Sequence, residues 1–293
     1  FFDEVQKSCI SRGVRITGSE LVGLIPLKAM LDAGKHYLKK QGRSLGVSEE
    51  ELIHIAIKSM GLDELGPFDP SKKIIEYQLK NESDERLVNL TAKKLAQETA
   101  SESMAPGGGS ISAYVGSLGI SLGTMVSNLS ANKPGWEEKL DDFSNWAEIG
   151  QSIQKELLFL VDEDTRSFNQ IIDAIRMAKD TENEKKLRLE AIQNASKYAA
   201  EVPFQVMQTT YKSLDLLKAM LEIGNPASMS DTGVGALCCL TAIEGAYMNV
   251  RINTKDLDDK DFASNLNQEA NKLMAKAKQN FGLITKQVHD NIH

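Results

Sequence analysis

The stretch that decides the fold is Glu156–Ile175, which reads ELLFLVDEDTRSFNQIIDAI. Its apolar side chains recur at intervals of three, four or multiples of these, at Leu157, Val161, Phe168, Ile171 and Ile175. This spacing is typical of one face of an α-helix. Asp164 falls in the same series, three residues after Val161 and four before Phe168. The sequence therefore predicts a long helix that carries one carboxylate on its apolar face.

Asp164 is the first candidate functional residue. A carboxylate on a core-facing stripe must be paired, hydrogen-bonded or protonated, because an isolated buried charge is costly. Burial also raises its pKa toward the range in which a carboxyl group acts as a general acid. The alternative is a structural Asp that bonds a facing helix. Asp162 lies roughly 200° away around the helix, near Lys155, Arg166 and Asn169, so we expect it on a wetter face.

Helical patterns extend in both directions from this stretch. We expect helices at residues 87–100, 110–129, 136–177 with room for one break, 179–223, 230–253 and 261–288. Pro203 should remove one backbone hydrogen bond from the fourth helix and kink it. Ser230 or Asp231 should cap the fifth. Long helices joined by short connections favour a helical bundle.

Residues 1–80 show a different pattern. We expect helices at residues 2–11, 27–41 and 48–60, and strands at residues 14–17 and 72–79. Ser48 should cap the third of these helices, with Glu51 at the capping-box position, and Gly61 should end it. These strands are too few for a sheet with its own core. The fold class is therefore mainly α, a long-helix bundle preceded by the α+β tail of a larger domain. The polar segment KNESD begins the connection between the two parts, and the linker is placed at residues 81–86.

Composition excludes several classes of function. The net charge of −7 and the pI near 5.3 disfavour a nucleic acid or a membrane surface as partner. No apolar run reaches the roughly 18 residues of a spanning helix. Three cysteines without a CxxC pair, and no signal-peptide pattern, favour a cytoplasmic location. The four histidines show no ligand spacing, so we expect no metal site.

A run of glycines, Gly107, Gly108 and Gly109, precedes Ser110 at the start of the second helix. Such a run brings backbone N–H groups close to an anion at a helix N-terminus, although a flexible turn is the alternative. The helix that follows is rich in small residues, with Gly116, Gly119 and Gly123 on one side. A small-residue face indicates close helix packing or a subunit interface.

The other candidate binding residues lie near and within residues 230–253. The joint GNPASMSD supplies Asn225, Ser230 and Asp231, each of which either caps a helix or binds a ligand. Near the helix end, Asn249 and Asn253 are four residues apart beside a small-residue stripe. Such carboxamides must be paired, either with a neighbouring helix or with the polar edge of a bound ring. Arg251 pairs with an acid or holds a substrate carboxylate.

Five segments together resemble the cyclodeaminase/cyclohydrolase family of folate enzymes. They are APGGGS (105–110), LVDEDTRSF (160–168), AAEVP (199–203), GNPASMSD (224–231) and GAYMNVRIN (245–253), in order and at compatible spacing. Residues 1–80, with TGSELVGLIPLKAML and GLDELGPFDPSKKIIEY, resemble the C-terminal end of a formiminotransferase domain. The resemblance implies a transferase remnant at residues 1–80 and a cyclodeaminase domain at residues 87–293.

The resemblance also implies a reaction, the conversion of 5-formimidoyltetrahydrofolate to 5,10-methenyltetrahydrofolate and ammonia, within histidine degradation and one-carbon metabolism. The departing amine must be protonated, and the family's proton donor corresponds to Asp164. A methenyltetrahydrofolate cyclohydrolase of the same fold and an inactive helical assembly module remain alternatives. No transferase activity is expected, because none of the four histidines lies in a matching motif.

The resemblance further implies the ligands and partners. We expect no cofactor beyond the tetrahydrofolate substrate, which the family uses in polyglutamylated form, and self-association as a dimer or larger assembly. From the positions of the polar groups, we place the folate in one cleft bounded by Gly107–Ser110, Asp164, Asn225, Asp231, Asn249 and Asn253. Its glutamate carboxylates should then lie at a helix N-terminus or at Arg251.

Overall fold

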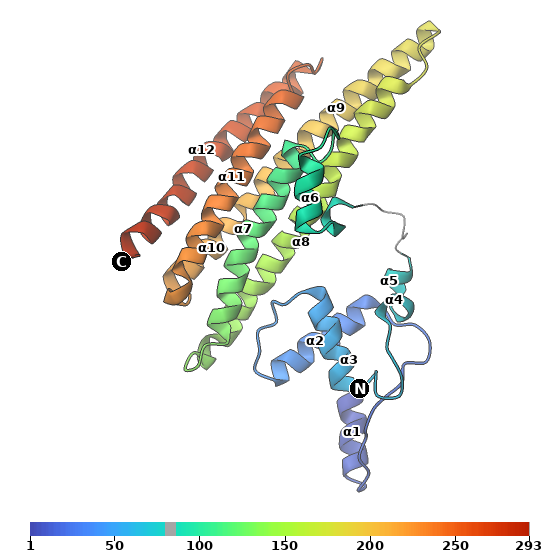
Figure 1. Cartoon of the computed structure of the whole chain (residues 1–293), viewed down its shortest axis with the longest axis vertical. Helices are drawn as coiled ribbons and strands as arrows, with labels where there is room; N and C mark the ends of the chain where they lie inside the picture. The colour runs from blue at the N-terminus through green and yellow to red at the C-terminus, as the bar shows by residue number, and fades with distance from the viewer. Residues whose placement is uncertain (80–85, 293) are drawn as a thin grey trace.

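The computed structural model describes residues 1–79 and 86–292 and shows two helical parts (Figure 1). The larger part, from residue 86 onward, is a bundle of long helices that lie side by side. The long helices are α7 (Gly108–Ala131), α8 (Leu140–Arg176), α9 (Glu182–Tyr211), α11 (Met229–Asn253) and α12 (Lys260–Asn291). The predicted long-helix bundle is confirmed.

Helix α7 is the centre of the bundle and packs mainly against α8 and α11. Its small residues allow this close approach. A Cβ atom on Gly119 would lie 2.7 Å from the Cys239 Sγ atom and 2.8 Å from the Gly235 carbonyl oxygen, both on α11. A Cβ atom on Gly123 would lie 2.6 Å from a methyl carbon of Leu216. The small-residue face therefore serves packing within one chain, and it is not exposed for a subunit interface.

Short helices complete the bundle. They are η1 (Leu87–Asn89), α6 (Ala92–Thr99), η2 (Glu137–Lys139), α10 (Ser213–Ile223) and η3 (Pro226–Ser228). The helix expected at residues 179–223 is two helices, α9 and α10, which meet at Lys212. The expected cap at Ser230 or Asp231 is wrong, because Asn225 caps η3 and α11 already begins at Met229. Pro226 starts this earlier turn.

The smaller part, residues 1–79, consists of short helices around a small core. They are α1 (Phe2–Ile10), α2 (Leu27–Lys40), α3 (Glu49–Met60), α4 (Pro70–Lys73) and α5 (Ile75–Gln78). As expected, the Ser48 hydroxyl accepts a hydrogen bond from the Glu51 N–H at the start of α3. Gly61, at φ 62°, ends the helix in the left-handed conformation.

The expected α+β character of this part is wrong. Among the described residues no sheet forms, and the two expected strands are absent: residues 14–17 are irregular and residues 72–79 lie largely in α4 and α5. Asp69 caps α4 by accepting a hydrogen bond from the Ser71 N–H. One isolated parallel bridge joins Ile25 to Ile74. A strand without paired neighbours is marginal, so the local helical signals of Asp69 and Pro70 decide the conformation.

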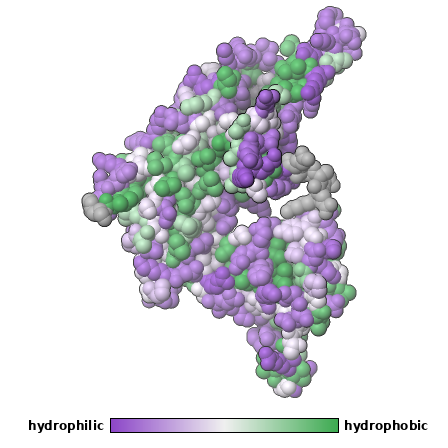
Figure 2. All heavy atoms as spheres, viewed as in Figure 1, coloured by the Kyte–Doolittle hydropathy of each residue, from purple (hydrophilic) through white to green (hydrophobic). Residues whose placement is uncertain are grey.

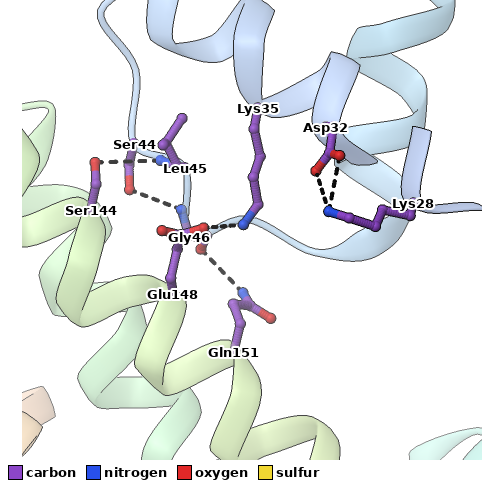
Figure 3. A network of polar contacts seen from close by, with 9 residues as sticks. All are labelled: Lys28, Asp32, Lys35, Ser44, Leu45, Gly46, Ser144, Glu148 and Gln151. Atoms are coloured by element: carbon purple, nitrogen blue, oxygen red, sulfur yellow. Dashed lines mark hydrogen bonds and ion pairs between the residues drawn. The ribbon is translucent and has the colours of Figure 1, made fainter. Parts of the chain in front are cut away.

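The two parts dock through the loop that precedes α3 (Figure 3). The Gly46 carbonyl oxygen accepts hydrogen bonds from Asn128 at 2.9 Å and from Gln151 at 3.2 Å. A Cβ atom on Gly46 would lie 2.1 Å from the Ala147 Cβ atom. Lys35 forms an ion pair with Glu148 beside this contact. The predicted linker, residues 81–86, lies outside the described residues except for Arg86.

Two helical segments among the described residues are long and apolar enough to cross a membrane, Gly108–Ala131 and Pro226–Asn253. In the most apolar 18 residues of each, 61% and 44% are buried inside the protein. The core helix of a bundle has the same composition, so this is weak support for a membrane span. The expectation that no helix spans a membrane therefore stays a prediction.

Candidate active site

Asp164 lies on α8, half-buried, and faces the N-terminus of α7. The Ser110 hydroxyl donates a hydrogen bond to Asp164 Oδ2 at 2.9 Å and lies 3.2 Å from the Thr165 hydroxyl. Burial raises the pKa of Asp164, while hydrogen bonds from the side chain and backbone N–H of Ser110 act in the opposite direction. The result is a carboxyl group fixed in position and held closer to its protonated form than an exposed Asp would be.

The glycine run brings this carboxyl group against the helix N-terminus. Helix α7 begins at Gly108, with Gly107 as its N-cap. A Cβ atom on Gly109 would lie 2.1 Å from Asp164 Oδ1, and one on Gly108 would lie 3.3 Å from Asn249 Nδ2. The flexible-turn alternative therefore fails for Gly108 and Gly109, because both are helical and both permit a close contact.

Two carboxamides on α11 complete the site. Asn249 donates a hydrogen bond from Nδ2 to the Gly245 carbonyl oxygen at 2.9 Å. Asn253, one turn later, donates from Nδ2 to the Ala199 carbonyl oxygen of α9 at 2.6 Å. Three long helices besides α7 thus contribute a side chain or a backbone group at this point of the bundle.

These groups line a hollow of about 250 Å³. Its walls include Gly107, Gly108, Gly109, Asp164, Thr165, Phe168, Ala199, Asn249 and Asn253. A second hollow of about 730 Å³ shares Ala105 and Thr165 with it and is lined further by Arg86, Lys94, Asp162 and Arg166. Pockets for drug-sized ligands have volumes of about 300–1,000 Å³. The smaller hollow therefore suits one ring system, and the larger one can hold the rest of an extended ligand.

The other predicted binding residues lie elsewhere. Asn225 caps η3 just before α11, Asp231 lies in the first turn of α11, and about 27 Å of helix separates Asp231 from Asn249. Asn225 Oδ1 accepts hydrogen bonds from the Ala227 N–H and from Lys133. Ser230 is exposed in the first turn of the helix. The single cleft is therefore wrong for one chain, because the length of α11 holds these residues at its opposite end.

Arg251 is also outside the hollow. Its side chain is exposed and donates a hydrogen bond to the Tyr247 hydroxyl at 3.1 Å. That hydroxyl in turn donates to Asn271 Oδ1 on α12 at 2.7 Å. Within one chain Arg251 therefore bonds Tyr247, which joins α11 to α12, and Arg251 is not part of the wall of the hollow.

Sequence reasoning missed Glu163, the most buried carboxylate among the described residues, whose exposed fraction is 4%. It accepts hydrogen bonds from the Tyr198 hydroxyl on α9 and from Arg166 at 2.5 Å. The bond to Glu163, together with partial burial, raises the pKa of Tyr198 to about 12. The three-residue spacing between Glu163 and Arg166 was the available signal. Glu163 joins α8 to α9 directly beside Asp164.

Asp162 lines the larger hollow together with Arg166 and Asn169, its expected neighbours, but its face is partly covered. It is half-buried and accepts a hydrogen bond from the Leu87 N–H at 2.7 Å. Burial raises its pKa, and the backbone N–H groups of Leu87 and Val88 act in the opposite direction. The polypeptide before α6 crosses α8 here, which is a tertiary contact that helical periodicity does not predict.

Comparison with known protein families assigns both parts of the chain to one family. Residues 91–272 match the family described as formiminotransferase-cyclodeaminase, and residues 1–80 match the formiminotransferase domain. The chain belongs to the formiminotransferase-cyclodeaminase family. Four of its five family-like segments meet at the small hollow, which marks the hollow as the family's candidate active site in this chain.

Relatives of this family member fall into two groups. The formimidoyltransferase-cyclodeaminases of Gallus gallus and Mus musculus are 36% and 32% identical over 97% of the chain. The chain spans 52% of each, about half of their length. The methenyltetrahydrofolate cyclohydrolase of Methylorubrum extorquens is 30% identical over 70% of the chain and 96% of its own length.

A solved structure supports the assignment of the bundle to this family. The formiminotetrahydrofolate cyclodeaminase of Thermotoga maritima has a TM-score of 0.61 to the chain and is 26% identical to it. The match covers 69% of this chain and 97% of the Thermotoga maritima chain. The bundle of this formiminotransferase-cyclodeaminase family member therefore has the fold of a cyclodeaminase.

Proposed function

We propose that the chain is a formimidoyltetrahydrofolate cyclodeaminase, an ammonia-lyase that forms 5,10-methenyltetrahydrofolate and ammonia from 5-formimidoyltetrahydrofolate. The observation that carries the proposal is the half-buried Asp164 carboxyl group, whose pKa is raised and which Ser110 holds at a ring-sized hollow. The family membership and the cyclodeaminase fold support the same reaction.

Asp164 acts as the proton carrier in this reaction. The N10 electron pair attacks the carbon of the protonated formimidoyl group and closes the five-membered ring, which gives a tetrahedral centre that carries a neutral amine and a protonated N10. Asp164 delivers a proton to the amine nitrogen, the carbon–nitrogen bond breaks, and its electron pair leaves with ammonia. The carboxylate then takes the N10 proton, so the acid is regenerated and the methenyl product carries the positive charge.

A second candidate function is methenyltetrahydrofolate cyclohydrolase, in which water takes the place of the amine. The observation that favours it is the relative in Methylorubrum extorquens, of which the chain covers almost the full length. The attached residues 1–80, which match a formiminotransferase domain, favour the cyclodeaminase instead.

One pair of assays separates these functions. In the first, the chain is incubated with 5-formimidoyltetrahydrofolate, and methenyl absorbance and ammonia are followed together. Equal amounts of both products support the cyclodeaminase. In the second, 5,10-methenyltetrahydrofolate is supplied and its loss is followed, which identifies a cyclohydrolase. A chain inactive in both assays would contradict both enzymatic functions and favour the alternative of a helical assembly module.

We further propose that the chain associates with a second copy of itself through α7 and α11. Large apolar side chains on the outer faces of these two helices are exposed, and Figure 2 shows apolar side chains gathered over this part of the bundle. They are Leu118, Met125 and Leu129 on α7 and Leu237, Met248 and Ile252 on α11. A large contiguous apolar patch is typical of an interaction site.

This association has a consequence for the remaining predicted site residues. In a two-fold dimer whose axis crosses α11 near its middle, the start of α11 in one copy lies beside its end in the other. Asn225, Ser230 and Asp231 would then approach the hollow of the second copy. Their role in substrate binding, like that of Arg251, stays a prediction.

The remaining proposals concern conditions and location. We propose that the chain needs no cofactor beyond its tetrahydrofolate substrate, in polyglutamylated form, and that it catalyses no formimidoyl transfer. Its three free cysteines, of which Cys239 is buried, support action in the reducing environment of the cytoplasm within histidine degradation.

A further inference from the structure

Helix α9 contains a buried proline, Pro203, well inside its bounds. Proline has no backbone N–H, so it cannot donate to the carbonyl group four residues earlier. In α9 this carbonyl belongs to Ala199, whose side chain is also buried. A buried carbonyl oxygen without a donor is costly, so a group from outside the helix must take the place of the missing N–H.

Asn253 at the end of α11 supplies that group. Its Nδ2 atom lies 2.6 Å from the Ala199 carbonyl oxygen. A carbonyl oxygen only accepts hydrogen bonds, which identifies the facing atom of the carboxamide as the donor nitrogen. Within the described residues, Oδ1 of Asn253 has no hydrogen-bond partner. Ala199 and Asn253 both line the hollow that contains Asp164.

Asn249, one turn earlier on α11, also has its amide nitrogen bonded to a carbonyl oxygen, here one of its own helix. Its Nδ2 atom is bound to the Gly245 carbonyl oxygen, and its Oδ1 has no partner in the part of the chain that the structure describes. The two carboxamides thus leave two acceptor oxygens at the hollow. A ligand that satisfies them must present N–H donors, as the ring nitrogens and amino group of a tetrahydropterin do.

We infer that Pro203 is a positioning residue for ligand recognition. Because Pro203 has no N–H, the Ala199 carbonyl oxygen is free to accept the hydrogen bond from Asn253 Nδ2, which fixes the Asn253 carboxamide. The Asn253 Oδ1 atom then accepts a hydrogen bond from an N–H donor of the bound ring. The identity of this ring as a tetrahydropterin rests on the proposed function. The orientation of Asn253 does not.

The decisive variant is Pro203→Ala. It restores an N–H that can close the helical bond to Ala199, so Asn253 is released. We expect an unfolding temperature equal to or above that of the parent, because a helix-interior proline is removed. We expect the Kd for 5-formyltetrahydrofolate, a stable analogue with a formyl group in place of the formimidoyl group, to rise roughly three- to tenfold by calorimetry.

A double-variant cycle tests the connection between the two residues. Asn253→Ala should weaken 5-formyltetrahydrofolate binding by a similar factor, and adding Pro203→Ala to it should have no further effect. Pro26→Ala, at the N-cap of α2 in the smaller part, is the matched control and should leave the Kd unchanged. A Pro203→Ala variant that binds like the parent, or losses that multiply in the double variant, would overturn the inference.

A second measurement decides the inference without folate. In protein labelled with ¹⁵N-Asn, the Asn253 side-chain amide should exchange slowly with solvent in the parent and faster in Pro203→Ala. If the parent does not bind 5-formyltetrahydrofolate, the proposed function fails, and this exchange rate alone tests the positioning. An unchanged rate in Pro203→Ala would overturn it. If Pro203→Ala does not fold, Asn253→Asp, which has no amide donor for Ala199, should show the same loss of binding.

Discussion

At the level of single residues, the site depends on one carboxyl group, that of Asp164, whose surroundings have opposite effects on its pKa. Burial favours the protonated form of Asp164, and Ser110 with the N-terminus of α7 favours the carboxylate. This balance raises the pKa without preventing ionisation, which is what a group that gives and regains a proton requires. Asp162 and Glu163, its neighbours, are instead bound by backbone or side-chain donors of other elements.

We expect Asp164→Asn to lower the rate of ammonia release by about 10²–10⁴-fold, because the amide has the same shape but cannot transfer the proton. Circular dichroism should show an unchanged helix content. Asp162→Asn is the control and should retain activity, since its amide oxygen can still accept the Leu87 N–H. Equal loss of activity in both variants would contradict the assignment of the proton donor.

The raised pKa of Asp164 also predicts how this variant affects stability. A carboxyl group with a higher pKa in the folded state binds more protons there than when unfolded, so its contribution to stability falls as the pH rises through that window. We therefore expect Asp164→Asn to be at least as stable as the parent at neutral pH in urea unfolding. The difference should shrink as the solution is acidified. Because the proton donor must be protonated to act, kcat of the parent should decrease as the pH rises above the raised pKa of Asp164.

The glycine run can be tested separately from the acid. Gly109→Ala places a Cβ atom 2.1 Å from the original position of Asp164 Oδ1, so the carboxyl group must move. We expect kcat to fall by about tenfold or more, because catalysis is sensitive to displacements of about 1 Å. Gly282→Ala on α12, whose Cβ atom would meet nothing within 4 Å, is the control and should retain activity. A fully active Gly109→Ala would show that the site does not need this close approach.

At the level of helices, the site exists because several elements are bonded to one another around it. Tyr198 and Ala199, consecutive on α9, hold Glu163 of α8 and Asn253 of α11 respectively. The second bond depends on the missing N–H of Pro203 in the same helix. A short segment of α9 therefore holds α8, which carries Asp164, and α11, which carries Asn253, in place relative to each other.

Tyr198→Phe tests the contact between α8 and α9. The change leaves the buried Glu163 carboxylate with Arg166 as its remaining side-chain partner, so we expect a loss of about 1–3 kcal/mol in the free energy of unfolding. Urea denaturation measures it. Tyr247→Phe removes a hydroxyl whose partners, Asn271 and Arg251, are exposed, and should cost less. Equal costs would show that the burial of Glu163 has no energetic consequence.

At the scale of both parts together, the smaller part meets the bundle where Gly46 contacts Ala147 of α8. The small hollow lies further along the same helix, at Asp164. About 26 Å of helix separates Ala147 from Asp164. The docking surface and the candidate active site are therefore distinct regions of one helix. The exposed apolar face of α7 and α11 is available for a second copy.

We expect Leu237→Glu to weaken self-association, because it places a charge on the exposed apolar face of α11. Light scattering over a range of protein concentrations should show a shift from dimer to monomer without loss of helix content. Leu65→Glu, an exposed leucine in the smaller part, is the control and should leave the mass unchanged. A parent chain that is monomeric and fully active would contradict the proposed association.

The sequence alone determined the long-helix character of the bundle and isolated the acid. Helical periodicity depends on local backbone geometry, so the spacing of Leu157, Val161 and Phe168 was enough to place Asp164 on their face. The Ser48 cap and the Gly61 stop were predicted for the same reason. The two strands were predicted wrongly, because a strand is stabilised by neighbours that residues 14–17 and 72–79 do not have.

Only the tertiary structure decided which polar groups meet. Sequence spacing places Asn249 and Asn225 near the two ends of one helix, but the contacts of each depend on segments that are distant in the chain. Glu163 accepts a hydrogen bond from Tyr198 only when α8 and α9 are packed together. Asn253 bonds to the Ala199 carbonyl oxygen only when α11 is packed against α9. Local sequence spacing determines which residues share one face of a helix. Which residues bond to each other across helices depends on the packing of the bundle, and the candidate site consists of residues from different helices that contact each other.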